Sequence, residues 1–459
     1  MRSISKGSGI SAFCDGGNTE IPWTQKKTPW YNMQTGNQVP ASADPENQRL
    51  VYKATIRLEE NEEKTMKQIT GSSLQEICAA FGIQTQPQAY GNGHINDTYF
   101  CRVEPEAGSA AENDLNRQVS ETGRKEEKQT AVILQRLNTE IFHDPEAVME
   151  NIGRVTAYLK ERLVKEGKDP LRGTLTVIPA AGGERLVQDK NGNVWRMYRY
   201  IEDSVSYEEA NPKLLYQTGK AFGRFQVMLK GFPAETLHET IPEFHNTKMR
   251  LDQLEQAVRE NRAGRAVQVT AELEQARRFA SYASLIMDGL EDGSIPYRVL
   301  HNDTKLNNVL FDRQSNEALC VIDLDTVMPG SLLFDYGDAL RYGASSGKED
   351  EPDLSRIWFD MEKFEAFTRG FLEQTASFLT EREKELLPVS ALILTYENGM
   401  RFLADYLNGD CYYKISRPSQ NLDRCRTHLK LAADIERRLP QMKQIVLAVL
   451  DSVLPFGFL

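Results

Sequence analysis

His301-Asn302-Asp303-Thr304-Lys305-Leu306-Asn307-Asn308 is the stretch that decides the expected fold of this chain. A short apolar run, Val309-Leu310-Phe311, follows it, and a second one leads into Val321-Ile322-Asp323-Leu324-Asp325. Short apolar runs of this kind predict two strands. We therefore expect the polar residues on either side to form one cluster beside a hairpin.

The spacing matches the H-x-D-x-x-x-x-N catalytic loop of the protein-kinase superfamily, which is followed by a metal-binding aspartate. Phosphoryl transfer asks a protein mainly to position groups and to neutralise charge. Asp303 fits the base beside the acceptor hydroxyl, and Asn308 and Asp323 offer the hard oxygen ligands that suit Mg²⁺. Lys305 is predicted to neutralise the transferring phosphoryl group. Asp325 is either a second metal ligand or a brace for the loop.

The chain around this motif divides into two regions of different character. Residues 66–203 combine short strand patterns with one long amphipathic helix, whereas residues 204–459 are mainly helical. This predicts an α+β, two-lobed, protein-kinase-like fold with a small β-rich N-lobe and a larger helical C-lobe. The polar segment 104–129 is expected to be a loop inserted in the N-lobe, and the aperiodic segment 1–65 a flexible extension. An ordinary loop with capping residues, the alternative for the motif, does not explain this two-lobe pattern.

Two features of the N-lobe are candidates for nucleotide binding. Gly91 and Gly93 lie between two expected strands, where glycine lets the backbone approach a nucleotide. An Asn-Gly pair is also a common hairpin turn, so this signal is weak alone. The third strand, which carries the phosphate-gripping lysine in a typical kinase, has no lysine here and ends in Arg136. We predict that Arg136 substitutes for it, paired with a glutamate of the next helix, Glu150 or Glu146.

Composition excludes several classes of function. The 459 residues carry Asp+Glu 66 against Lys+Arg 55, a net charge of −11, without a long basic run, which argues against nucleic acid and anionic membranes as partners. No apolar stretch approaches the length of a membrane-spanning helix. The six cysteines lie far apart, and no apolar region follows Met1. We therefore expect a cytoplasmic protein without a disulfide framework, and a monomer is favoured.

The segment 299–341 resembles the aminoglycoside phosphotransferase and choline kinase group of small-molecule kinases, through HNDTKLNNVLFD, VIDLDTVMPGS and FDYGDALR. Within that group, the chain is similar to the bacterial N-acetylhexosamine 1-kinases. The segments that carry this similarity are YGNGHINDTYF (90–100), ILQRLNTEIFHDPEAVMENI (133–152), ETIPEFHNT (239–247) and ENGMRFLADYLNGDCYY (397–413). The resemblance extends to the missing third-strand lysine.

This resemblance implies an activity and its cofactors. It implies transfer of a phosphoryl group from ATP, with Mg²⁺, to the anomeric hydroxyl of N-acetylglucosamine or N-acetylgalactosamine in sugar salvage. Asp303 would be the base, and Asn308 and Asp323 the metal ligands. Arg401 and Tyr412 are the candidates for sugar contacts, alongside Asp303.

Alternatives remain open at the level of the sequence. Glu397, Arg401 and Asp405 recur every fourth residue on one helix face, which also fits a surface salt-bridge ladder. Asp335, Asp338 and Arg341 are expected to be structural and to tie the loop after the metal site to the helical lobe. The acceptor could be another hexose, an amino alcohol or an aminoglycoside. A pseudokinase that binds nucleotide without turnover is the remaining alternative.

Overall fold

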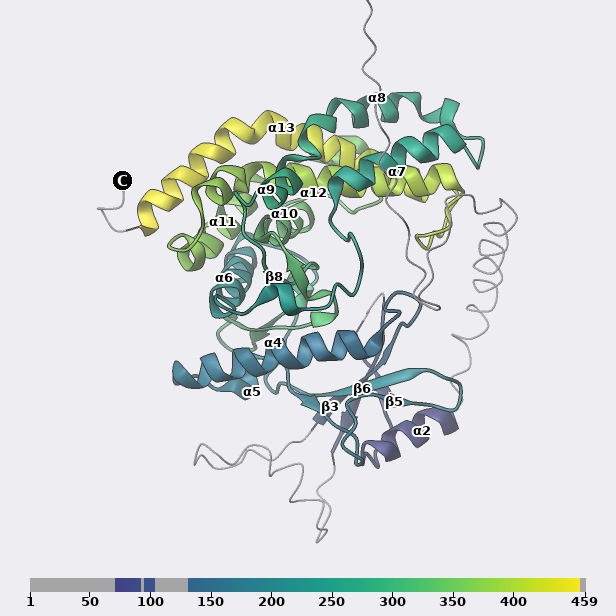
Figure 1. Ribbon diagram of the computed structural model, residues 1–459, viewed down its shortest axis with the longest axis vertical. Helices are drawn as coiled ribbons and strands as arrows, with labels where there is room; N and C mark the ends of the chain where they lie inside the picture. Colours follow the sequence, from purple (N-terminus) through teal and green to yellow (C-terminus); the bar gives the residue numbers. More distant parts are fainter. Residues whose placement is uncertain (1–70, 92–94, 104–130, 455–459) are drawn as a thin grey trace, which may run out of the picture. The chain divides into compact units, whose positions relative to one another are not determined.

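The computed structural model describes residues 71–91, 95–103 and 131–454 of the chain (Figure 1). The predictions for the extension 1–65, for the loop 104–129 and for Gly93 fall outside these residues.

An antiparallel sheet is the centre of the small lobe. Its strand order is β1-β2-β3-β6-β4, and β5 pairs with β6. The strands are β1 (Gln88–Ala89), β2 (Asp97–Arg102), β3 (Ala131–Leu137), β4 (Val177–Ile178), β5 (Val187–Gln188) and β6 (Val194–Arg199). The longer strands are rich in the β-branched and aromatic residues that favour a half-buried pleated surface.

The register of β2, β3 and β6 forms rows of side chains across the sheet. One row consists of Asp97, Arg136 and Trp195. The adjacent row consists of Thr98, Gln135 and Arg196. Because successive residues of a strand point to opposite faces, these two rows lie on different sides of the sheet.

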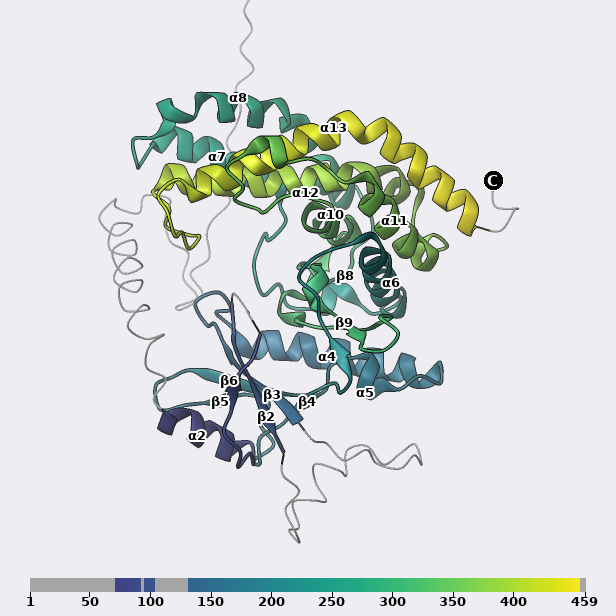
Figure 2. The same ribbon diagram turned by 180° about the vertical axis from the view of Figure 1, so that it is seen from behind.

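Each face of the sheet is covered by a different helix (Figures 1 and 2). Helix α2 (Gly71–Ala80) covers the outer face, where Ile77 and Phe81 join Val132, Leu134 and Trp195 in one apolar cluster. Helix α4 (Pro145–Lys165) lies between the sheet and the large lobe, and its apolar stripe belongs to the main core. The inner face of the sheet therefore looks toward the large lobe.

The chain passes from one lobe to the other after β6. Strand β7 (Ser204–Val205) pairs with β9 (Val309–Asp312), which in turn pairs with β10 (Ala318–Val321). A separate ladder joins β8 (Arg298–Leu300) to β11 (Met328–Gly330). The two ladders bracket the segments 301–308 and 322–327, so both predicted halves of the site start and end on strands.

Helices make up most of the large lobe. They are α6 (Pro212–Met228), α7 (Thr247–Glu260), α8 (Thr270–Arg278), α9 (Leu285–Glu291), α10 (Leu332–Gly343), α11 (Met361–Thr375), α12 (Glu381–Asn408) and α13 (Gln420–Val453). The short helix α5 (Pro170–Gly173) follows α4 in the small lobe. Short 3₁₀ helices are η1 (Ala234–Thr236), η2 (Ala266–Val269), η3 (Ala280–Tyr282), η4 (Leu306–Asn308), η5 (Leu324–Thr326) and η6 (Leu354–Arg356).

The core of the large lobe depends on close helix packing. Helix α12 is buried over most of its length, and its segment 386–394 is almost entirely apolar. Helices α6 and α11 pack so closely that a Cβ on Gly219 would lie 2.2 Å from the Phe367 carbonyl oxygen. A Cβ on Gly370 would lie 2.0 Å from the Tyr216 carbonyl oxygen, so glycine is required at both positions.

The architecture confirms the predicted α+β fold with a small sheet-containing lobe and a larger helical one. Among the helices of the described ranges, none has the length and apolar character needed to cross a membrane.

Candidate active site

His301 fixes the start of the predicted catalytic loop. Its ring is fully buried and packs between Phe222 and Phe225. Nε2–H donates to the carbonyl oxygen of Ile322 at 2.8 Å, and Nδ1 accepts from the backbone N–H of Asp303 at 3.2 Å. One neutral tautomer satisfies both bonds. The imidazole therefore joins the catalytic loop to the segment that follows β10.

Asp335, in the first turn of α10, also holds the catalytic loop in place. Its carboxylate accepts from the backbone N–H groups of His301, at 2.9 Å, and Asn302, at 2.8 Å. Asn302 has a left-handed backbone with φ +63°, a conformation that these bonds stabilise. The prediction that Asp335 is structural is confirmed.

Asp303 is oriented by two side chains of its own loop. Lys305 Nζ lies 2.6 Å from Asp303 Oδ1, while Asn308 Nδ2 donates to Asp303 Oδ2 at 3.0 Å and to its carbonyl oxygen at 2.8 Å. Burial favours the neutral amine of Lys305, but the Asp303 carboxylate outweighs it and raises the lysine pKa above its ordinary value. The three residues thus form the compact, partly exposed unit that the spacing predicts.

Asp323 follows β10 with a left-handed backbone, φ +60°. Burial raises the pKa of its carboxyl to about 7, and the nearby carboxylates of Asp325 and Asp303 add to the effect. Three carboxylates therefore lie close together, and a divalent cation would offset their negative charge.

The residues around Asp323 fit a Mg²⁺ site in which the protein supplies only a few of the ligands. The amide hydrogens of Asn308 point to Asp303, so its side-chain oxygen is the group left to face a metal. In the part of the chain that the structure describes, no three His, Cys, Asp or Glu residues could together hold a metal ion. Mg²⁺ commonly takes one or two protein oxygens and completes its shell with phosphates and water, which Asn308 and Asp323 would allow.

Asp325 has both carboxylate oxygens engaged by the small lobe. Arg196 Nη2 lies 2.6 Å from Oδ1, and Asn96 Nδ2 donates to Oδ2 at 2.7 Å. Asn96 Oδ1 in turn accepts from the backbone N–H of Asn138 at 3.0 Å. Of the two roles left open by the sequence, this geometry favours the brace, since Asp325 ties the metal segment to the sheet.

The predicted pairing of Arg136 with Glu150 or Glu146 is wrong. Arg136 Nε donates to Asp97 Oδ2 at 2.8 Å, and Glu150 Oε2 bonds instead to His238 Nε2 at 2.8 Å. Arg136 stands in the outer row of the sheet, because its strand neighbour Gln135 occupies the inner row. Arg196 was not predicted from the sequence. The order Trp195-Arg196-Met197 places this charged residue between two apolar ones in a strand, and this is the signal that could have indicated it.

Gly91 lies two residues after β1 with φ +74°, a backbone conformation that glycine adopts without strain. No atom lies within 4 Å of the position that a Cβ would take, so conformation rather than space accounts for the glycine. Its predicted contact with a nucleotide stays a prediction.

Arg401 and Tyr412 are brought together in the large lobe. The Arg401 guanidinium lies 5.7 Å from the ring centres of both Phe244 and Tyr413, and it interacts with the Tyr412 hydroxyl. Tyr412 is 69% exposed, whereas Arg401 is only partly exposed. The sugar-contact role of these two residues stays a prediction.

Asp405 positions the segment that carries Tyr412. Its carboxylate accepts from the backbone N–H groups of three consecutive residues, 411–413, at 2.8–3.0 Å, and from Asn421 Nδ2 at 2.8 Å. Glu397 is also buried, and it accepts from Thr247 Oγ1 at 2.7 Å. The alternative of a surface salt-bridge ladder is therefore wrong, because the carboxylates of this helix face point into the protein.

His245 is a residue of this region that the sequence analysis did not single out. Its Nδ1 lies 2.9 Å from Glu397 Oε1, and the ring packs between Phe244 and Phe334. Its Nε2 is buried without a hydrogen-bond partner among the described residues. Because it also interacts electrostatically with Asp338, it lies on the side of the lobe that contains the catalytic loop.

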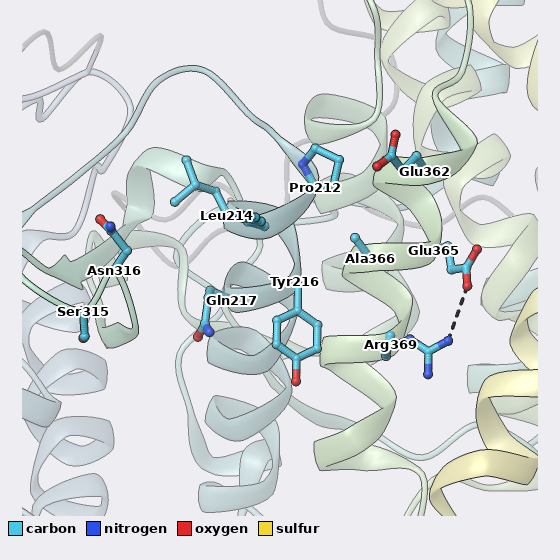
Figure 3. Close-up of a pocket in the computed structure, with 11 residues that line it drawn as sticks. Pro212, Leu214, Tyr216, Gln217, Ser315, Asn316, Glu362, Glu365, Ala366 and Arg369 are labelled. Atoms are coloured by element: carbon cyan, nitrogen blue, oxygen red, sulfur yellow. Dashed lines mark hydrogen bonds and ion pairs between the residues drawn. The ribbon is translucent and has the colours of Figure 1, made fainter.

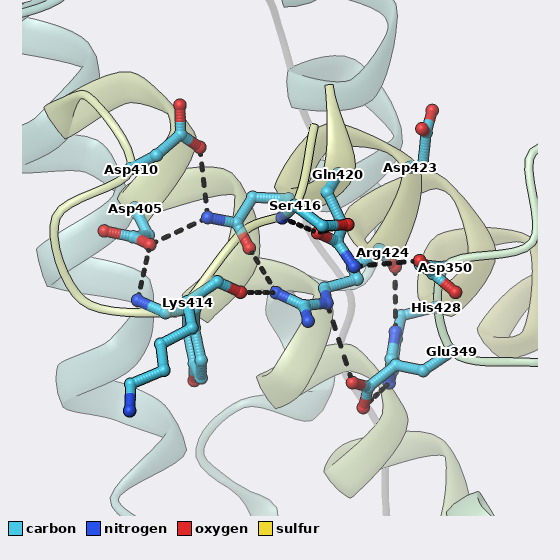
Figure 4. A network of polar contacts seen from close by, with 12 residues as sticks. Glu349, Asp350, Asp405, Asp410, Lys414, Ser416, Gln420, Asp423, Arg424 and His428 are labelled. Carbon is cyan, nitrogen blue, oxygen red and sulfur yellow. Dashed lines mark hydrogen bonds and ion pairs between the residues drawn. The ribbon is translucent and has the colours of Figure 1, made fainter. Parts of the chain in front are cut away.

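Glu349 contacts Arg424 and His428 of α13 in a polar network (Figure 4). Arg341 Nε donates to Asp338 Oδ1 at 2.8 Å, and that this pair is structural stays a prediction. Arg341 Nη1 also lies 3.5 Å from Glu349 Oε1, and Asp338 interacts electrostatically with Lys305. Glu349 interacts in the same way with Tyr413.

Charged groups of both signs lie around Arg341 and Arg401. The cations there include Arg250 and Arg424, and the carboxylates include Asp338, Glu349 and Glu397.

A separate hollow of about 690 Å³ lies between α6, the β9–β10 turn and α11 (Figure 3). Two of its charged side chains, Arg369 and Glu365, pair with each other at 3.3 Å. None of the predicted site residues lines it.

The fold and the arrangement around Asp303 are those of a phosphotransferase, and comparison with known proteins identifies its group. The chain belongs to the phosphotransferase enzyme family, whose sequence pattern matches residues 89–367.

A solved structure agrees with this fold. An aminoglycoside phosphotransferase from Alicyclobacillus acidocaldarius is 14% identical with a TM-score of 0.51, over 82% of this chain and 96% of that one. Together with the family match, it confirms the predicted kinase-like fold. Two other structures are less similar. A microcompartment-associated aminopropanol kinase is 16% identical with a TM-score of 0.49, over 81% and 98%. Choline kinase from Cryptosporidium parvum is 12% identical with a TM-score of 0.46, over 82% and 99%.

Proposed function

We propose that this phosphotransferase is a small-molecule kinase that transfers a phosphoryl group from ATP to the anomeric hydroxyl of an N-acetylhexosamine. The observation that carries the kinase part is the geometry around Asp303, whose carboxylate is held by Lys305 at 2.6 Å and by Asn308 at 3.0 Å. A carboxylate fixed in this way suits a base that orients a hydroxyl and accepts its proton.

The other residues of the site have complementary roles. Asn308 and Asp323 would hold Mg²⁺, which when bound neutralises charge on the transferring phosphates. Lys305 holds the Asp303 carboxylate in place and puts a positive charge beside the acceptor. His301 and Asp335 hold the loop in place through buried hydrogen bonds, so the base needs little rearrangement before reaction. This complete set favours a working enzyme over a pseudokinase.

The acceptor side favours a neutral substrate. A cationic acceptor, such as an amino alcohol or an aminoglycoside, is best held by carboxylates or by aromatic rings that no cation of the protein already contacts. Here arginines alternate with carboxylates, and aromatic rings such as Tyr413 flank Arg401. Donor groups beside flat apolar rings suit the hydroxyls and the ring face of a sugar. The resemblance to N-acetylhexosamine 1-kinases names the sugar, and another hexose is the second candidate.

An acceptor screen tests this proposal. The purified chain is incubated with ATP and Mg²⁺ and, in turn, with N-acetylglucosamine, N-acetylgalactosamine, other hexoses, choline, an amino alcohol and an aminoglycoside. We expect turnover with the two N-acetylhexosamines, and phosphorus–proton NMR should show phosphate coupled to the anomeric proton. The Asp303→Asn variant serves as the control for contaminating kinases. Coupling to the C6 protons, or turnover of cationic acceptors only, would contradict the proposed acceptor.

A further inference from the structure

The inner face of the small-lobe sheet carries a deeply buried arginine, Arg196 of β6. Its side chain is 1% exposed, although a buried guanidinium is costly unless it is paired. It stands beside Gln135 of β3, whose Oε1 accepts from Arg196 Nε at 3.2 Å and from Nη2 at 3.0 Å. Gln135 is thus the inward-facing residue of the third strand, and it has no charge. The cation of this face comes from the neighbouring strand.

The guanidinium points to the metal segment of the large lobe. Its Nη2 lies 2.6 Å from Asp325 Oδ1, two residues after Asp323, and the Asp323 carboxylate also interacts with it electrostatically. Arg196 therefore bridges the sheet and the segment beside which the phosphates of a nucleotide must lie if Asp323 holds their metal ion.

One nitrogen of the Arg196 guanidinium has only a weak hydrogen-bond acceptor. Its Nη1 has the sulfur of Met149 as a partner at 3.8 Å, and a thioether is a weak acceptor. Tyr198, the next residue on the same face, packs its ring 5.0 Å from the guanidinium carbon. The Tyr198 hydroxyl is itself buried without a partner among the described residues. A weakly bonded donor of Arg196 and the unpartnered Tyr198 hydroxyl thus occur side by side on the inner face, which points to an acceptor-rich ligand.

We propose that Arg196 is the cation that contacts the nucleotide phosphates, in place of the third-strand lysine of typical kinases. A guanidinium binds phosphate oxygens through parallel N–H groups, so an arginine reaching from β6 can serve where β3 offers only Gln135. Asp325 holds Arg196 in position for this contact. The inference rests on the proposed use of a nucleotide, but not on the identity of the acceptor.

Calorimetric titration of the full chain with ADP and with adenosine tests the proposal, because adenosine lacks the phosphates. The double variant Arg196→Met/Asp325→Asn removes both charges of the buried pair, and Asp325→Asn alone is its reference. Relative to that reference, ADP affinity should fall about 10- to 100-fold, as expected for lost charged hydrogen bonds, while adenosine affinity should stay the same. Arg196→Lys keeps the charge and should lose less than the double variant. Arg136→Met, on the outer face, is the matched control and should bind ADP normally.

Three results would overturn the proposal. The first is an equal loss of ADP and adenosine affinity, which would indicate a merely structural role. The second is an unchanged ADP affinity in the double variant. The third is a loss of ADP affinity in Arg136→Met as large as that in the Arg196 variants. If the double variant does not fold, the decision passes to Arg196→Lys, which must then weaken ADP but not adenosine binding. All of these titrations are done without any acceptor, so a wrong acceptor assignment would leave their outcome untouched.

Discussion

His428, on α13, provides a prediction in which the sign and size of a pH effect follow from the structure. Burial lowers the pKa of this histidine to about 4. Its Nδ1 lies 2.8 Å from the Arg424 carbonyl oxygen, and its Nε2 lies 3.4 Å from Arg341 Nη1. The carboxylates that face it are Glu349, with an oxygen 3.8 Å from Nε2, and the more distant Asp338. The ring is therefore held neutral as an acceptor from a cation.

The sign of the effect follows from proton binding. In the unfolded chain His428 should titrate near its ordinary pKa of about 6.5, so between pH 6.5 and 4 the unfolded state binds more protons than the native state. The native state therefore loses stability as the pH falls through this window, and the contribution is absent above it. At about 1.4 kcal/mol per pKa unit, the loss is roughly 2 kcal/mol at pH 5 and at most roughly 3 kcal/mol near pH 4.

The measurement compares urea unfolding of the wild type and of His428→Gln at pH 7.5, 6 and 5. The glutamine does not titrate, so the variant should lose less stability than the wild type as the pH falls, by about 2 kcal/mol at pH 5. His143→Gln, at an exposed position, is the matched control and should follow the wild type. If the wild type and His428→Gln lose stability in parallel, His428 is not held neutral and the reasoning fails.

Three further predictions concern the site. Asp303→Asn should lower turnover about 10²- to 10⁴-fold with little change in ADP affinity, and near-normal turnover would remove Asp303 from the chemistry. Asp323→Ala should raise the Mg²⁺ concentration needed for half-maximal activity, and an unchanged Mg²⁺ titration would exclude it as a ligand. Arg401→Ala should raise the KM for the sugar without changing background ATP hydrolysis, whereas Arg265→Ala, which removes another arginine packed on a tyrosine, should leave that KM unchanged.

The catalytic loop was predictable from the sequence because its geometry is mostly local. Asp303, Lys305 and Asn308 lie within six positions of one another, and the strands on either side allow few conformations. The spacing alone therefore predicts that these side chains meet. Asp335 is different, because it meets His301 across 34 positions and so depends on the placement of α10 beside the loop.

Arg196, the buried cation of the small-lobe sheet, could not be predicted in this way. Whether Arg136 or its neighbour faces the nucleotide side depends on one residue of strand register, and a shift by one residue exchanges the two faces. The position of Arg196 follows only from the pairing of β6 with β3, which places it beside Gln135. Its Nη2 then lies 2.6 Å from Asp325 Oδ1.

The acceptor side depends on still longer-range packing. His245 meets Glu397 across 152 positions, and Arg341 meets His428 across 87. The sequence by itself determined the class of chemistry, since that depends on residue types at short spacing. Only the tertiary structure decided which buried charges surround the base, because helices from distant parts of the chain bring them together, and no local pattern encodes which helices pack.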